Sequence, residues 1–254
     1  MKLWHTERGS GTPFVLLHPG GVDSRSLDPL VAELESSYLV RTPEQRAHGH
    51  TPDVDGPLTF AAMAADTAEF IESTGDAPVH LLGHSDGAIV ALHVALTRPD
   101  LVRSLVFAGA VCHHEGWLPG VLDGEPPEFF GDSYGEVSPD GRDHWPIVVA
   151  KMAAMHETEP ALSLDDLRGL HVPTLVVIGD DDEIRFDHAR AMYEALPDGE
   201  FAVVPRSTHG FPVEKPALFA QLIRDFHAAD KGNGFAPLRR GGSEDAQASA
   251  ADLG

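Results

Sequence analysis

A serine between two glycines is the strongest candidate for chemistry in this chain. Residues 83–87 read Gly-His-Ser-Asp-Gly, the G-x-S-x-G pattern of a sharp strand-to-helix turn that exposes a serine hydroxyl. The preceding run, 79–82, is apolar, and small and apolar residues follow at helical spacing until Pro99. Both flanks therefore fit the turn, and we predict that Ser85 is a nucleophile.

A serine hydroxyl is a poor nucleophile and needs a histidine base, held in the right tautomer by a carboxylate. Of the fifteen histidines, His209 is the best placed, because it lies beside a glycine in a loop between the last predicted strand and the last predicted helix. The alternative for His209 is a helix-capping or solvent-exposed side chain. We predict that it is the base.

The orienting acid should lie between the serine and the histidine in chain order. Residues 179–183, Gly-Asp-Asp-Asp-Glu, directly follow an apolar run that ends at Ile178. Four acids are more than one histidine needs, so most of them must be solvated or cap the next helix. The residues alone leave the choice among them open.

Two backbone N–H groups are needed to stabilise an oxyanion. The amide of Asp86 follows the nucleophile at the positive end of its predicted helix. The glycine-rich turn 18–21, His-Pro-Gly-Gly, follows the first strong strand and is the expected source of the second donor. The alternative for this turn is simple strand termination.

The elements that must position these residues alternate along the chain. Apolar runs predict strands, and residues with a period near 3.6 predict helices. The segments are strands at 14–17, 38–40, 79–82, 105–108, 174–178 and 201–204, and helices at 27–34, 60–73, 88–98, 187–196 and 217–229. This alternation predicts an α/β fold with a doubly wound, mostly parallel sheet.

One stretch interrupts the alternation and divides the chain. Residues 111–170 contain proline- and glycine-rich loops and one helical segment, 145–155. We interpret this stretch as a small, mainly helical cap inserted into a core made of 1–110 and 171–230, since loops of this length usually have a function. Residues 231–254 are rich in Gly, Ala and Ser, and we predict that they form a disordered tail.

The cap contains an unusual density of aromatic residues. They suit an apolar substrate pocket, and the alternative is that they form the cap's own core. The candidate pocket residues are Gly21, His84, Trp117, Phe130 and Trp145.

Composition makes nucleic acid an improbable partner. With 18 basic and 40 acidic residues the net charge is −22, which disfavours nucleic acid and favours a neutral, apolar or cationic small-molecule substrate. We find no apolar stretch near the roughly 20 residues of a membrane helix and no signal-peptide pattern. We expect a cytoplasmic protein, and nothing in the sequence indicates its oligomeric state.

We expect neither a metal nor a cofactor. The single cysteine, Cys112, excludes an internal disulfide and a cysteine-based zinc cluster, and it is best interpreted as a small core residue. His48 and His50 form an H-x-H pattern, but a zinc site needs further ligands.

Taken in order, these motifs resemble the α/β-hydrolase superfamily over residues 3–229, in its small, short-capped bacterial esterase, lactonase and meta-cleavage-hydrolase type. The turn at 45–51, Gln-Arg-Ala-His-Gly-His-Thr, belongs to the same set. The resemblance implies Ser85 as nucleophile and His209 as base. It also implies Asp182 as the acid, three residues after the glycine that ends its strand, and Gly20 beside Asp86 in the oxyanion hole.

The chain departs from the superfamily pattern in three places. Pro19 replaces a usual glycine, so Gly21 stays an alternative oxyanion donor, and Ala47 replaces another glycine in the 45–51 turn. The N-terminus is short, so the usual first strand is expected to be missing or truncated.

The resemblance and the motifs together predict a serine hydrolase acting on a small, fairly hydrophobic carboxylic ester, lactone or thioester through an acyl-enzyme. The first alternative is carbon–carbon bond hydrolysis, or a lyase or isomerase step of a biosynthetic pathway, on the same fold. A further alternative is a non-catalytic ligand-binding protein.

Overall fold

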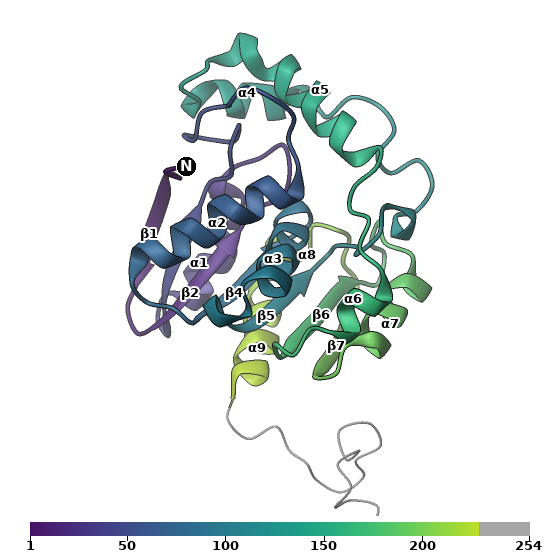
Figure 1. Cartoon of the computed structure of the whole chain (residues 1–254). Helices are drawn as coiled ribbons and strands as arrows, with labels where there is room; N and C mark the ends of the chain where they lie inside the picture. Colours follow the sequence, from purple (N-terminus) through teal and green to yellow (C-terminus); the bar gives the residue numbers. More distant parts are fainter. Residues whose placement is uncertain (229–254) are drawn as a thin grey trace, which may run out of the picture.

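The computed structural model describes residues 1–228, which form a seven-stranded sheet with helices on both faces (Figure 1). The strand order is β1-β3-β2-β4-β5-β6-β7. Strand β1 pairs antiparallel with β3, and all other neighbouring strands of this sheet are parallel. The predicted fold class, a doubly wound and mostly parallel sheet, is confirmed.

The elements alternate as the sequence predicts. The strands are β1 (His5–Gly9), β2 (Thr12–Leu17), β3 (Tyr38–Pro43), β4 (Val79–His84), β5 (Val102–Ala108), β6 (Thr174–Gly179) and β7 (Gly199–Val204). The α-helices are α1 (Asp28–Leu34), α2 (Phe60–Thr74), α3 (Asp86–Thr97), α4 (Glu128–Val137), α5 (Trp145–His156), α6 (Leu164–Arg168), α7 (Phe186–Ala195), α8 (Phe211–Glu214) and α9 (Pro216–His227). Among residues 1–228, no helix is both long and apolar enough to cross a membrane.

Each central strand is apolar on both sides because helices cover both faces of the sheet. In β2, Phe14 and Leu16 pack in the cluster that includes α1 and α9, whereas Val15 and Leu17 pack in the cluster that includes α2 and α3. This two-sided burial explains why the strand sequences are continuous apolar runs rather than alternating ones.

The structure adds elements that the sequence did not reveal. A five-residue first strand, β1, is present, and its composition, His-Thr-Glu-Arg-Gly, is polar because it is a half-exposed edge strand. Helices α4, α6 and α8 are also additions. The predicted disorder of 231–254 lies outside the described residues.

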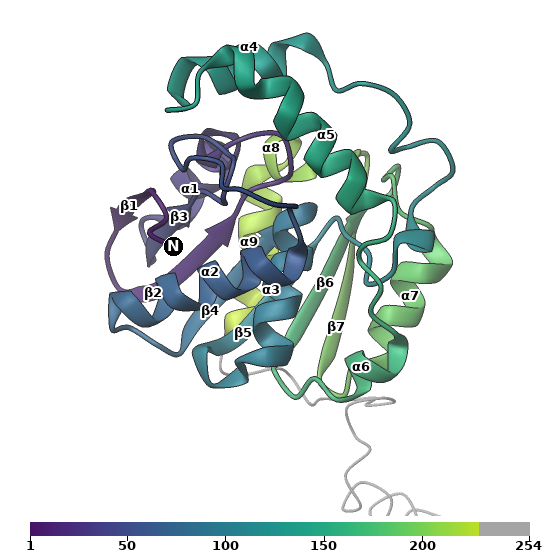
Figure 2. The same cartoon turned by 45° about the horizontal axis from the view of Figure 1, so that its top comes forward.

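Residues 111–170, which we call the cap segment, contribute none of the seven strands and contain α4, α5 and α6. Figures 1 and 2 show α4 and α5 lying across one edge of the sheet. Because β2, β4, β5, β6 and β7 are parallel, their carboxyl ends meet at a common edge, where ligands bind in open α/β sheets. The division into a core (1–110 and 171–230) and a cap domain (111–170) stays a proposal.

The turn between β4 and α3 depends on two backbones in close contact. A methyl group at Gly83 would overlap the carbonyl oxygen of Gly87 in the first turn of α3. That oxygen cannot move without displacing the helix, so the position tolerates no side chain.

We expect Gly83→Ala to lower the free energy of unfolding by about 3 kcal/mol, the upper part of the range for overpacked sites. Gly169→Ala is the matched control, because Gly169 is exposed, has a negative φ and has only one neighbour close to an added methyl group. Urea unfolding followed by circular dichroism measures both. Equal midpoints for the two variants would contradict this account of the turn.

Candidate active site

Ser85 lies at the tip of the β4–α3 turn in a strained backbone conformation. Its φ is 55° and its ψ −125°, a backbone region that residues other than glycine rarely adopt. The turn is held because the Ser85 amide donates to the carbonyl oxygen of Ala108, at the end of the neighbouring strand β5, at 2.9 Å. The geometry is that of the predicted nucleophile elbow.

Three predicted side chains form one hydrogen-bonded chain. The Oγ of Ser85 lies 3.0 Å from Nε2 of His209, and Nδ1 of His209 lies 2.8 Å from Oδ1 of Asp182. These residues come from the carboxyl ends of β4, β7 and β6. Of the consecutive acids, Asp182 is therefore the one bonded to Nδ1, whereas Oε2 of Glu183 lies 3.9 Å from Nε2.

Asp182 is held as an ionised acceptor. Its carboxylate accepts the backbone N–H groups of Gly179 and Glu183, both at 2.8 Å. Burial raises the pKa of Asp182, but the hydrogen bond and charge of His209 and these backbone donors outweigh burial and lower it overall. A charged Asp182 fixes the proton of His209 on Nδ1 and leaves Nε2 free to accept the serine proton.

Opposing effects act on the pKa of the His209 imidazole. Burial lowers its pKa, whereas the hydrogen bond and charge of Asp182, followed by the charges of Glu183 and Asp86, raise it, and the net pKa is raised. A neutral histidine is needed to accept a proton. The site should therefore lose its base as the pH falls through a value above 6.5, the ordinary pKa of histidine.

The candidate oxyanion donors lie on both sides of the serine. Asp86 opens α3, and the first N–H groups of a helix have no intrahelical acceptor. Across from it, the amide of Gly21 donates to Nε2 of His48 at 3.1 Å. Because that amide already donates to His48, Gly20 remains the candidate donor of the glycine turn.

His48 supports this turn as a neutral acceptor. Its Nδ1 donates to the carbonyl oxygen of Arg46 at 2.9 Å, so Nε2 is free to accept from Gly21. Burial lowers the pKa of His48 to about 4, in agreement with this tautomer. The adjacent Ala47 has a φ of 63°, a left-handed conformation that explains why glycine suits this position better.

The remaining histidine of the H-x-H pattern has a different partner. Nδ1 of His50 lies 3.0 Å from the carboxylate of Glu44, which also accepts from the hydroxyl of Ser24 at 2.7 Å. Within the described part of the chain, no group of three His, Cys, Asp or Glu side chains could hold a metal ion.

The cap segment brings apolar side chains to the glycine turn. A methyl group at Gly21 would lie 3.3 Å from Phe130, and 3.6 Å from both Met152 and Trp145. Three of the candidate pocket residues, Gly21, Phe130 and Trp145, are thus close together. Met152 is an addition, and it lies seven residues after Trp145, two turns along the same face of α5.

Trp117 packs against His209 of the Ser85–His209–Asp182 chain, which we call the relay. Its ring lies 6.0 Å from that of His209, edge to face, and the backbone on both sides of it is bonded to the segment that follows Asp182. Those bonds run from Leu118 to Glu183 at 2.8 Å and from Arg185 to Gly116 at 2.9 Å. The indole N–H is buried and has no hydrogen-bond partner within residues 1–228, so it offers a donor beside the candidate base.

The side chain of His84 is directed to the loop that carries His209. Its side chain is buried, and its Nε2 donates to the carbonyl oxygen of His209 at 2.8 Å. Burial lowers the pKa of His84 to about 3, so the ring is neutral. This hydrogen bond holds the His209 loop against the end of β4, and a role of His84 in the substrate pocket stays a proposal.

Sequence reasoning missed one polar contact of the site. The carboxylate of Asp86 lies 3.0 and 3.1 Å from Nε2 of His156, at the end of α5. His156 lies eleven residues after Trp145 and four after Met152, so helical periodicity places all three on one face of α5. That spacing was visible in the sequence, but the partner of His156 was not.

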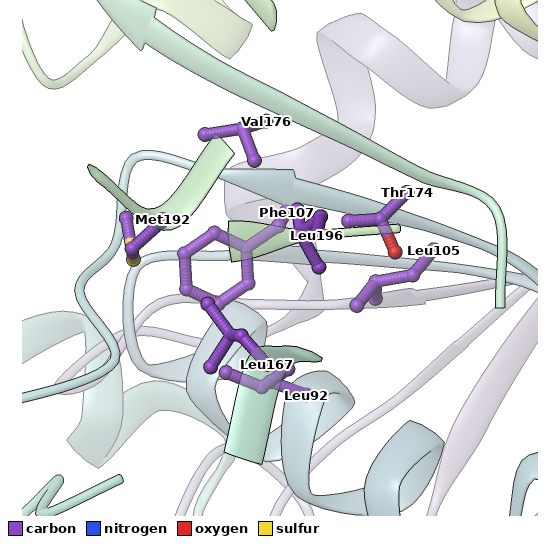
Figure 3. A pocket seen from close by; sticks show the side chains of 8 residues that line it. All are labelled: Leu92, Leu105, Phe107, Leu167, Thr174, Val176, Met192 and Leu196. Carbon is purple, nitrogen blue, oxygen red and sulfur yellow. The ribbon is translucent and has the colours of Figure 1, made fainter. Parts of the chain in front are cut away.

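A small cavity lies away from these residues. It has a volume of about 10 Å³ and sits between the sheet and helices α3, α6 and α7 (Figure 3). Its lining side chains are apolar apart from Thr174, as Figure 3 shows. This volume holds at most one water molecule, so the cavity is a packing gap and not a substrate site.

Comparison with known proteins agrees with the geometry. The chain is 22% identical to a putative carbamate hydrolase, RutD, of Azorhizobium caulinodans, over 88% of this chain and 94% of that protein. It is 27% identical to a pimeloyl-[acyl-carrier protein] methyl ester esterase of Neisseria meningitidis, over 83% and 91%. A solved serine hydrolase involved in carbazole degradation matches 87% of this chain and 93% of its own, with a TM-score of 0.73 and 22% identity.

The family comparison covers most of the sequence. Residues 14–222 match the model of the alpha/beta hydrolase family. That range includes all the motifs on which the resemblance was based, from the glycine turn to His209. The chain is therefore an enzyme of the alpha/beta hydrolase family.

Proposed function

We propose that this enzyme is a serine hydrolase that cleaves a small, fairly hydrophobic carboxylic ester, lactone or thioester through an acyl-enzyme. The observation that carries the proposal is the unbroken hydrogen-bond chain from Ser85 through His209 to Asp182. A serine, a neutral imidazole and an ionised carboxylate in this order are the parts that acyl transfer requires.

In the first half of the reaction, Oγ of Ser85 attacks the substrate carbonyl carbon while Nε2 of His209 takes the hydroxyl proton. The carbonyl electron pair moves to oxygen, and the amides of Gly20 and Asp86 donate to that oxyanion. The intermediate then collapses, the bond to the leaving group breaks, and His209 returns the proton to the alcohol or thiol.

The second half releases the acid. His209 takes a proton from water, which attacks the acyl carbon, and a second oxyanion forms at the same two amides. Collapse breaks the bond to Ser85 Oγ, and the serine recovers its proton from His209. Asp182 stays ionised throughout and stabilises the imidazolium in both halves.

Two further observations support the substrate class. The side chains of Phe130, Trp145 and Met152 meet at Gly21, and an apolar lining favours an apolar acyl or alcohol group. Among the similar proteins, one is a methyl ester esterase and one a thermophilic esterase of Thermogutta terrifontis, so ester cleavage is chemistry that similar chains perform.

We expect Ser85→Ala to abolish labelling by a fluorophosphonate probe and to lower kcat for a p-nitrophenyl ester by about 10⁴-fold or more. Ser73→Ala is the matched control, because Ser73 lies on α2, where its hydroxyl donates to the backbone of Phe70. Mass spectrometry locates the label, and a panel of p-nitrophenyl esters and lactones reports acyl preference. Unchanged turnover by Ser85→Ala would refute the proposal, and turnover by wild type without a trappable acyl-enzyme would favour carbon–carbon cleavage instead.

We expect Asp182→Asn to lower kcat by about 10³- to 10⁴-fold, because an amide does not hold the base in the right tautomer or stabilise its cation. Asp181→Asn is the control: its carboxylate is exposed, and that residue meets the His209 loop through its backbone N–H, which donates to Ser207 at 3.1 Å. Steady-state kinetics at pH 8 separates the two. Similar activity in both variants would remove Asp182 from the mechanism.

A further inference from the structure

The carboxylate of Asp86 lies beside the two amides that would bind the oxyanion. Asp86 is buried, and a methyl group placed at Gly20 would overlap its Oδ2. The same residue supplies one of the candidate donors through its backbone. A negative side chain at this place opposes the negative charge that develops on the substrate oxygen, and burial makes the repulsion stronger.

One cap histidine is placed to cancel this charge. Nε2 of His156 lies 3.0 and 3.1 Å from the two carboxylate oxygens of Asp86. Burial lowers the pKa of His156, but the charge and hydrogen bond of Asp86, and the charge of Glu159, outweigh burial and raise it. The directions of the two pKa values, raised for His156 and lowered for Asp86, favour an imidazolium paired with a carboxylate.

The other histidines facing Asp86 do not supply this positive charge. Nε2 of His48 accepts from the amide of Gly21, and Nε2 of His18 accepts from the amide of Gln45 at 3.0 Å. A ring nitrogen that accepts is unprotonated, so both rings are neutral. His209 also faces Asp86, but it has to be neutral when it acts as base.

We propose that His156 is a positioning residue of the reaction, whose imidazolium neutralises the carboxylate of Asp86 and so allows an oxyanion to form beside it. The inference rests on the proposed acyl transfer at Ser85. His156 belongs to α5 of the cap segment, whereas Asp86 opens α3 of the sheet layer. The charge of the oxyanion site is therefore balanced only when α5 lies in place over the sheet.

A double-mutant cycle tests this role. His156→Gln removes the charge but keeps a side-chain amide, and we expect it to lower kcat for p-nitrophenyl butyrate by about tenfold or more, with little change in KM. Asp86→Asn removes the opposing charge. We expect the double variant Asp86→Asn/His156→Gln to recover most of that loss, a coupling that independent structural damage would not produce.

The pH profile gives a second readout. The groups facing His209 are Asp182, Glu183, Asp86 and His84, and of these only Asp86 loses a positively charged partner when His156 is replaced. An uncompensated Asp86 raises the pKa of His209 further. The acidic limb of kcat/KM should therefore move to higher pH in His156→Gln and return in the double variant.

The control is a second cap histidine with a carboxylate partner. Nε2 of His144, just before α5, lies 2.9 Å from Asp53, whose carboxylate also accepts from Nζ of Lys151 at 2.7 Å. His144→Gln therefore removes a histidine–carboxylate contact at the other end of the same helix but leaves the carboxylate with a cationic partner. It can change thermal stability, but we expect it to leave the acidic limb in place.

If His156→Gln does not fold, the pH profiles of kcat/KM for wild type and Asp86→Asn still test the inference. Deprotonation of His156 at alkaline pH leaves the same uncompensated carboxylate, so kcat/KM of wild type should fall there, and Asp86→Asn should remove that fall. An unshifted limb and wild-type kcat in His156→Gln, or a double variant as slow as His156→Gln, would overturn the inference. Failure of the proposed function is separate, because wild type would then show no fluorophosphonate label on Ser85.

Discussion

The close contact between the end of β4 and the start of α3 is the constraint on which the rest of the site depends. It leaves no room for a side chain at Gly83 and holds Ser85 at a φ of 55°. In a regular helix or strand, neighbouring side chains would surround the serine hydroxyl. At this turn, its hydroxyl reaches the histidine loop after β7, while the following amide stays at the open end of a helix.

Electrostatics in the site follows a single pattern, in which each buried carboxylate has a histidine partner. Asp182 pairs with His209, and Asp86 pairs with His156. An unpaired buried charge is costly, and this chain, with a net charge of −22, has few basic side chains to spare. Histidine suits the role because its charge can be lost or gained near neutral pH. In the proposed mechanism the first pair moves a proton to and from the reacting groups, whereas the second pair keeps its charges while the reaction proceeds.

Much of this structure could be predicted because its determinants are local. The strand–turn–helix around Ser85 lies within residues 79–97, and the strand with the acid loop that contains Asp182 lies within residues 174–183. The polar strand β1 was missed because edge strands lack the apolar run that identifies buried ones. The pairing of Asp86 with His156 was missed for another reason: the two residues are 70 positions apart, and only the packing of α5 over the sheet brings them together.

The proposed reaction depends on the locally determined residues at the strand ends, whereas substrate specificity depends on the cap residues that packing brings to them. The relay residues follow strands whose order in a parallel sheet is set by the connections between them, so their mutual distances vary little with the cap. Phe130, Trp145, Met152 and His156 reach the site only through α4 and α5. A shift of α5 would move the apolar lining and the charge partner of Asp86 together. In the proposed mechanism, acyl preference and the charge balance of the oxyanion site are thus coupled through one helix, and a substitution that displaces α5 should change both.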